Sequence, residues 1–260
     1  MKRTRWMVAM LVSLMVSSCA TIKPPPPPLR VGVTPNYPPL IMLQGDKAAG
    51  AECDFAVQLA SELGRPLQLV PVPWELQLEE LQAQRIDVIM SGMTITPARQ
   101  TCAAFCEPYM DNPLVAVVRR GEAGRYASAA AILGATGDIG VLRGTSADAF
   151  VRRECKHAKV LPLNARDDVA FYLANQRIEL FIDDVAAAVQ IVSRHESRLE
   201  LVFIPLESQQ LAWAVRLDDD ALRTQANEAL ARWRANGLLD QILGHWLPYL
   251  RKGAEQPPAK

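Results

Sequence analysis

The chain has 260 residues, of which 50% are hydrophobic and 22% are charged. This composition is typical of a globular protein, and the length allows one large domain or two lobes of roughly 100 residues each. The 28 basic residues balance the 28 acidic ones. Non-specific binding to nucleic acid depends on dense Lys and Arg, so this balance argues against a nucleic-acid-binding protein.

Residues 1–18 have the pattern of a bacterial export signal. A basic start precedes an apolar run from Trp6 to Val16, which is interrupted by Ser13. A run of about 11 residues is too short to span a bilayer, which needs roughly 20. The pattern therefore predicts a cleaved signal peptide.

The predicted signal ends at Cys19, after Val16-Ser17-Ser18, and this arrangement resembles the bacterial lipobox. The resemblance implies that Cys19 carries a diacylglycerol and anchors the mature chain to a membrane. The alternative is an ordinary signal peptide with an incidental cysteine. Residues 19–28 contain five consecutive prolines, Pro24 to Pro28, which predict a stiff spacer of about 15 Å.

The first half of the mature chain alternates between strand and helix patterns. The apolar spacing predicts strands at 29–33, 67–72 and 87–90, with helices at 54–63 and 76–84 between them. Such alternation is typical of a parallel α/β sheet. Thr96 and Pro97 then have the residue types of an N-cap and a first helical position.

The second half continues in the same way, and Asp184 has the residue type of a cap for the helix that follows it. No internal repeat and no transmembrane helix is expected. The predicted strands are 112–119, 138–142, 160–163, 180–182 and 211–215, and the predicted helices are 147–154, 166–175, 185–194, 218–235 and 238–246.

Several of these segments resemble the family 3 extracellular solute-binding proteins, the polar amino-acid-binding components of ABC importers. The resemblance is strongest at 87–99 (Asp-Val-Ile-Met-Ser-Gly-Met-Thr-Ile-Thr-Pro-Ala-Arg) and runs in collinear order from Leu29 to Tyr249. The other matching segments are 29–32, 36–39, Trp74, 139–146, 177–184 and 227–240 with Trp246.

The resemblance implies an α/β, two-lobed fold of the periplasmic-binding-protein type (type II). Each lobe is expected to have a mixed or parallel sheet flanked by helices, and two crossing strands form the hinge. The implied lobes are 29–110 plus 208–250 and 111–207, with a flexible tail at 251–260. The implied molecule is a monomer that holds its ligand between the lobes and partners an ABC permease.

An amino-acid ligand needs partners for both of its charges, because an unpaired buried charge is very costly. Arg99 is the expected partner of the carboxylate, since its guanidinium is permanently charged and binds two oxygens at once. Thr94 is expected to add a hydroxyl, and Thr145 and Ser146 to contribute from the opposite lobe. The alternatives are a surface Arg99 paired with an acid, and hydroxyls that only cap their own loops.

Asp183 is the expected partner of the ammonium, because ligands of open α/β sheets bind beyond the carboxyl ends of strands. Under this hypothesis Asp184 caps the next helix and Asp183 faces the ligand. The Ser91 hydroxyl and the Gly92 carbonyl are expected to share the ammonium. The alternative is that both aspartates are capping residues.

Tyr37 and Trp74 are expected to form the walls of the side-chain pocket, with ordinary core packing as the alternative. Family members that bind lysine or arginine often carry an acid where this chain has Thr34. This departure argues against a strongly cationic ligand side chain.

Other sites are not expected. His157, His195 and His245 stand apart and fit no metal-ligand spacing, and no nucleotide or cofactor motif is present. Four further cysteines, Cys53, Cys102, Cys106 and Cys155, allow up to two disulfides or serve as small buried apolar residues.

Two other functions remain as alternatives to a transport binding protein. Some members of this superfamily resemble cyclohexadienyl (prephenate or arogenate) dehydratases, which need a general acid in the cleft. Glu75 and Glu107 are the candidates for that acid. The second alternative is a ligand sensor that is read by a membrane partner other than a permease.

Overall fold

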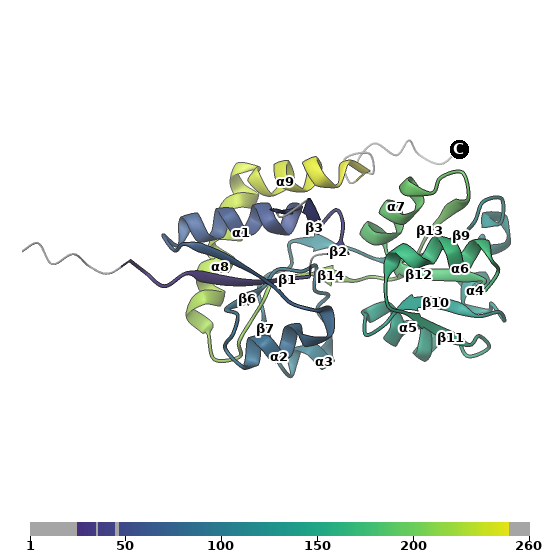
Figure 1. Ribbon diagram of the computed structural model, residues 1–260, viewed down its shortest axis with the longest axis horizontal. Coiled ribbons are helices and arrows are strands. Elements are labelled where there is room, and N and C mark those ends of the chain that lie inside the picture. The colour runs from purple at the N-terminus through teal and green to yellow at the C-terminus, as the bar shows by residue number, and fades with distance from the viewer. Residues whose placement is uncertain (1–24, 35, 45–46, 250–260) are drawn as a thin grey trace, which may run out of the picture.

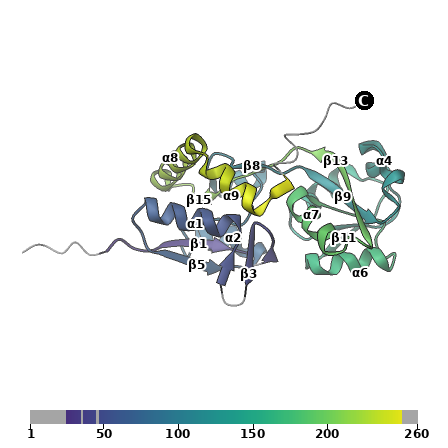
Figure 2. The ribbon, with the colours of Figure 1, turned by 90° about the horizontal axis from the view of Figure 1, so that it is seen from above.

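The computed structural model describes residues 25–34, 36–44 and 47–249. Figure 1 and, from above, Figure 2 show two lobes that lie side by side along the long axis of the molecule. The chain enters the first lobe at the end away from the second lobe (Figure 1). There Arg65 donates hydrogen bonds to the carbonyl oxygens of Pro27 and Pro28 (3.0 and 2.8 Å), so the last described part of the spacer is held against this lobe.

The first lobe is built on a five-stranded sheet in the order β5-β1-β6-β15-β7. Strand β1 is parallel to β5 and β6, and β15 is antiparallel to β6 and β7. Successive side chains of a strand point to opposite faces, so Val88 packs in one core and Ile89 in another. The strands are β1 (Leu29–Val33), β5 (Leu67–Pro71), β6 (Val88–Ile89), β7 (Ala104–Phe105) and β15 (Ala214–Val215).

Helices cover both faces of this sheet. Phe55 and Trp233 belong to the larger core, under the helices α1, α8 and α9, whereas Leu81 of α2 packs against the other face (Figure 1). A small sheet of β2, β3 and β4 lies beside the larger core. These elements are β2 (Asn36–Tyr37), β3 (Ile41–Gln44), β4 (Lys47–Ala49), α1 (Ala51–Glu62), η1 (Trp74–Leu76), α2 (Gln77–Gln82), α3 (Pro97–Gln100), α8 (Asp220–Asn236) and α9 (Leu238–Trp246).

The second lobe has a similar plan, with a sheet in the order β11-β10-β12-β9-β13. Strands β10, β11 and β12 are parallel, and β9 is antiparallel to β12 and β13. Ile182 packs on one face of the sheet and Phe181 on the other. The elements are β9 (Leu114–Arg119), η2 (Ala123–Tyr126), α4 (Ala129–Leu133), β10 (Ile139–Leu142), α5 (Ser146–Glu154), β11 (Val160–Leu163), η3 (Arg166–Asp168), α6 (Val169–Ala174), β12 (Leu180–Asp184), α7 (Val185–Arg194) and β13 (Leu199–Glu207).

Two short strands join the lobes. β8 (Met110–Asp111) and β14 (Gln210–Leu211) pair in antiparallel register, with Asp111 opposite Gln210. The expected lobe boundaries, 110/111 and 207/208, fall within β8 and at the end of β13. The two-lobed α/β fold with mixed sheets and two crossings is therefore the fold that the sequence predicted.

Most predicted elements are present, and the helices 185–194 and 238–246 have the predicted bounds. Thr96 caps α3 by accepting a hydrogen bond from the backbone N–H of Arg99. The long edge strand β13 was not predicted. The segment predicted as a strand at 211–215 is two short strands, β14 and β15, because the chain leaves the hinge there to join the first sheet.

The cysteines of the described chain are all free thiols. Cys53, Cys106 and Cys155 are buried, and Cys102 is partly exposed. Cys53, Cys106 and Cys155 therefore follow the apolar alternative, and none of the four cysteines forms a disulfide within the described residues. In the part of the chain that the structure describes, no helix is both long and apolar enough to cross a bilayer. Cys19, the predicted signal peptide and the predicted tail at 251–260 lie outside the described residues.

Candidate functional site

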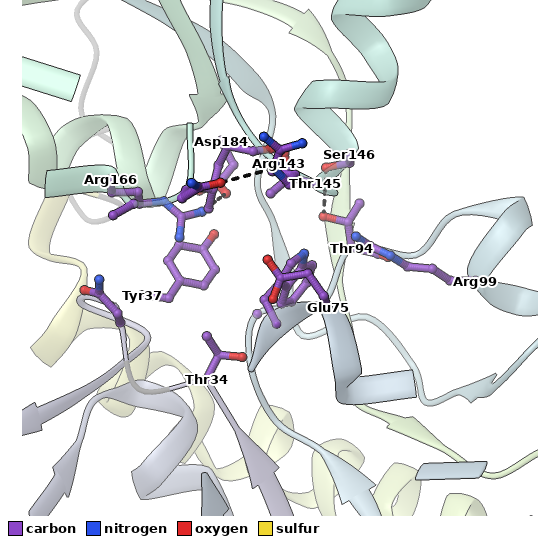
Figure 3. A pocket seen from close by; sticks show the side chains of 16 residues that line it. Thr34, Tyr37, Glu75, Thr94, Arg99, Arg143, Thr145, Ser146, Arg166 and Asp184 are labelled. Atoms are coloured by element: carbon purple, nitrogen blue, oxygen red, sulfur yellow. Dashed lines mark hydrogen bonds and ion pairs between the residues drawn. The ribbon is translucent and has the colours of Figure 1, made fainter. Parts of the chain in front are cut away.

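A cavity of about 160 Å³ opens between the two lobes. Figure 3 shows side chains from both lobes pointing into it. Most of the predicted site residues line it: Tyr37, Trp74, Gly92, Thr94, Arg99, Thr145 and Ser146.

Arg99 is placed at the cavity by the short helix α3. Its Nη1 donates a hydrogen bond to the carbonyl oxygen of Thr94 (2.9 Å), and its guanidinium carbon lies 5.0 Å from the ring centroid of Trp74. Burial lowers the pKa of Arg99 to about 10, so it stays charged at neutral pH. Among the described residues Arg99 forms no ion pair with an acid. The part of the chain that the structure describes thus supplies no acidic partner of the kind that the alternative requires.

A charged cluster of Asp183, Asp184 and Arg166 lies on the second lobe. The Nε of Arg166 donates to Oδ2 of Asp183 (2.8 Å), and its Nη2 lies 3.9 Å from Oδ2 of Asp184. Burial opposes a charged Arg166, but the two carboxylates outweigh it and raise its pKa. Burial also raises the pKa of Asp183, with Arg166 opposing the shift. With all three groups charged, the cluster has a net charge of about −1.

The two aspartates do not divide their roles as the sequence suggested. Asp184 accepts a hydrogen bond from the N–H of Ala187 (3.0 Å), which caps α7, and it also lines the cavity. Asp183 is only 1% exposed, is bound by Arg166 and does not line the cavity. The carboxylate that faces the cavity is thus the capping one.

Thr94 and Ser146 connect the lobes at one side of the cavity. Their hydroxyl oxygens lie 3.4 Å apart. Both hydroxyls donate to Oε1 of Gln209, at 3.5 Å from Thr94 and 2.7 Å from Ser146. Thr145 caps α5 by accepting a hydrogen bond from the N–H of Asp148 (3.3 Å). These hydroxyls face both their own loops and the cavity, so capping and ligand contact are compatible here.

Ser91 and Gly92 differ in their access to the cavity. Ser91 is fully buried and does not line it, because its Oγ accepts from the N–H of Thr34 (2.9 Å) and donates to the carbonyl of Gly32 (3.2 Å). Gly92 lines the cavity with φ of 64°, and a Cβ there would lie 2.4 Å from the Tyr37 ring. Only glycine fits at this position without strain.

The two aromatic residues contact both the cavity and the lobes. Tyr37 is 4% exposed, and its hydroxyl accepts a hydrogen bond from Asn112 (3.2 Å). Its ring centroid lies 4.2 Å from the guanidinium carbon of Arg166. Trp74 donates from Nε1 to the carbonyl oxygen of Gly144 on the second lobe (3.2 Å). Tyr37 therefore belongs to the core and to the cavity wall at once.

Sequence reasoning did not single out Arg143, Arg166 or Gln209. Arg166 begins η3, three residues beyond the carboxyl end of the parallel strand β11, and this position could have drawn attention to it. Of the two candidate acids, Glu75 lines the cavity, whereas Glu107 does not. Among the described residues no group of His, Cys, Asp and Glu is arranged to hold a metal ion.

Comparison with known proteins gives the class of this chain. Residues 29–249 match the family of bacterial extracellular solute-binding proteins, family 3. The chain belongs to this family and is therefore an exported protein that binds a solute.

Three relatives illustrate the range of the family. The chain is 30% identical to the L-cystine-binding protein TcyJ of Escherichia coli over 222 residues, which cover 84% of this chain and 82% of TcyJ. It is 27% identical to the cyclohexadienyl dehydratase of Pseudomonas aeruginosa over 228 residues, 85% of this chain and 83% of that protein. The crystal structure of a mutant of ArgBP from T. maritima is similar with a TM-score of 0.76 and 29% identity, and covers 85% of this chain and 95% of that one.

Proposed function

We propose that this protein captures an amino acid, or a similar small zwitterion, between its lobes and delivers it to an ABC importer. One observation carries the proposal. The same cavity exposes an arginine without an acidic partner among the described residues, Arg99 on the first lobe, and a cluster of net negative charge on the second lobe. These are complementary to a carboxylate and an ammonium group.

The arrangement suits closure by the ligand. The carboxylate would bind Arg99, with the hydroxyls of Thr94 and Ser146 beside it, and the ammonium would bind Asp184. A ligand that contacts both lobes stabilises the closed state relative to the open one, which is how hinge closure around a ligand works. The names of the relatives support this proposal, since TcyJ is an L-cystine-binding protein.

The proposal includes a lipid anchor at Cys19, which follows the predicted signal peptide. The proline-rich residues 19–28 would hold the lobes away from the bilayer. A membrane permease is the proposed partner, and a membrane sensor is the alternative. Mass spectrometry of the protein purified from membranes tests the anchor: an acylated N-terminal peptide that starts at Cys19 is expected, and an unmodified one would contradict it.

A thermal-shift panel of amino acids, with Arg99→Ala as the variant, tests the capture of a zwitterion. A ligand at 100 times its Kd should stabilise the wild type by about 2.7 kcal/mol, and Arg99→Ala should lose this stabilisation. Arg85→Ala is the control, since Arg85 lies on the same lobe and pairs with Glu80 outside the cavity. If Arg99→Ala binds as tightly as the wild type, the proposed carboxylate site is wrong.

The panel also includes prephenate, because Glu75 lines the cavity and one relative is a cyclohexadienyl dehydratase. A binding protein is expected to leave prephenate unchanged. Formation of phenylpyruvate that is lost in Glu75→Gln would instead indicate the dehydratase function.

A further inference from the structure

Two opposite charges in the cavity have no ion-pair partner among the described residues. Glu75 comes from η1 on the first lobe, and Arg143 follows β10 on the second. Each is the immediate neighbour of a residue in the hydrogen bond that joins the lobes, from Trp74 to the carbonyl of Gly144. The two charged residues therefore adjoin one interlobe contact in sequence, one from each lobe, and both line the cavity (Figure 3).

The contacts of these two side chains leave their charges available. Glu75 accepts no hydrogen bond from the described residues, and Arg143 donates from Nε to the amide oxygen of Asn164 (3.1 Å). That bond orients the guanidinium without neutralising it. Arg143 and Glu75 are exposed in this form, so water now solvates both charges. Closure around a ligand would remove that water, and the electrostatic interactions of Glu75 and Arg143 with the ligand would then become stronger.

The charges around the cavity divide into two sets. Arg99 and the cluster of Arg166, Asp183 and Asp184 supply about +1 and −1 for one zwitterionic head. Arg143 and Glu75 then supply a second pair of +1 and −1. Because the total is zero, a ligand without net charge closes the cavity without leaving an uncompensated charge inside.

We propose that the ligand is an amino acid whose side chain ends in a second ammonium and a second carboxylate. The second ammonium binds Glu75, and the second carboxylate binds Arg143. This inference rests on the proposed function, since the first head occupies the Arg99 and Asp184 sites described above.

Ligands with a single head fit the second set of charges less well. A cationic side chain would match Glu75 but place a positive charge near Arg143. An acidic side chain would match Arg143 but face Glu75. An uncharged side chain would leave both Glu75 and Arg143 without partners when the cavity closes, and buried charges without partners are costly.

Calorimetric titration of the whole protein with ligands that differ at one end tests this. meso-Diaminopimelate and L-cystine have two heads, lysine and arginine end in a cation, glutamate ends in an anion, and methionine is uncharged at its end. A two-headed ligand should bind most tightly. Because a hydrogen bond to a charged group contributes about 1.5–3 kcal/mol, Glu75→Gln and Arg143→Gln should each weaken its binding by roughly tenfold or more.

The same two variants should change the affinity for methionine by less than about twofold, because methionine reaches neither group. Glu107→Gln and Arg177→Gln are matched controls, since both residues are exposed and lie outside the cavity. An equal loss for methionine and the two-headed ligand would show that Glu75 or Arg143 acts on the lobes and not on the second head, which overturns the inference.

Failure of this inference is distinguishable from failure of the proposed function. If amino acids bind through Arg99 but arginine, lysine or methionine binds more tightly than either two-headed ligand, the second-head site is wrong and the zwitterion site stands. If no amino acid in the panel binds, or if Arg99→Ala has no effect, the proposed function itself is overturned.

Discussion

Glu52 is a buried carboxyl group that is hydrogen-bonded to Gly92, one of the residues that line the cavity. It accepts hydrogen bonds from the N–H of Gly92 (2.6 Å), the hydroxyl of Tyr109 (2.7 Å) and the indole N–H of Trp213 (3.0 Å). Burial raises the pKa of Glu52 to about 7, although these three bonds favour the charged form. The residue thus ties the loop that carries Gly92 to the aromatic core.

Because the pKa of Glu52 is raised, the folded protein keeps a proton on this group between about pH 4.5 and 7, where the unfolded chain has already released it. The stability from Glu52 is therefore fully present below its usual pKa of 4.5 and is lost as the pH rises through about 7. The loss is about 3 kcal/mol in the free energy of unfolding.

Replacement of Glu52 by glutamine should abolish this dependence, because an amide does not titrate. Urea unfolding of both proteins between about pH 4.5 and 8 measures it, and the difference between them isolates Glu52 from Asp183, whose pKa is also raised. Equal slopes for the two proteins would contradict the prediction. The amide group introduced by Glu52→Gln would face the indole N–H of Trp213, so this substitution should lower stability at acidic pH.

The residues that the sequence placed best are those whose position depends on local structure. Thr94 and Arg99 line the cavity because they belong to one loop and one capped turn, and both can be read from a short segment. The role of Asp183 could not be read in this way. Its neighbour Arg166 is 17 residues away in sequence, and only the tertiary fold brings the two together.

At the scale of elements, β12 and α7 meet at Asp184. This residue ends the strand, caps the helix and lines the cavity. The predicted cap was correct because it depends only on neighbouring residues. Strand β13 was missed for the opposite reason: Pro205 interrupts its pattern, and proline is tolerated there because β13 is an edge strand.

Asp184→Asn removes the negative charge and keeps the N-cap of α7, because asparagine is as good an N-cap as aspartate. We expect affinity for the amino acid to fall by roughly tenfold or more, with little change in stability. Asp184→Ala should lose the same affinity and also about 1 kcal/mol of stability from the missing cap.

Calorimetric titration and thermal unfolding of the two variants measure these effects, with Asp183→Asn as the comparison. If Asp184→Asn binds normally and Asp183→Asn does not, then Asp183 holds the ammonium, as the sequence first suggested.

At the scale of the whole molecule, the lobes already touch at one side of the cleft. The hydroxyls of Thr94 and Ser146 both donate to Gln209, which precedes the hinge strand β14. A net hydrogen bond contributes about 1 kcal/mol, so these contacts bias the ligand-free protein toward the closed arrangement.

Gln209→Ala should shift the ligand-free protein about fivefold toward the open arrangement, since about 1 kcal/mol corresponds to that factor. Small-angle X-ray scattering should show a larger radius of gyration without ligand and an unchanged one with saturating ligand. An unchanged radius in the ligand-free variant would mean that Gln209 does not hold the lobes together.

The hydrogen bonds from Arg65 to Pro27 and Pro28 determine which lobe bears a pull on the N-terminal segment. The leading segment joins the first lobe at its far end, and the chain crosses to the second lobe at the paired strands β8 and β14 (Figure 1). Tension on the N-terminus is therefore borne by the first lobe alone and does no work on the hinge angle. A change in the angle between the lobes therefore leaves the point of attachment of the leading segment unchanged.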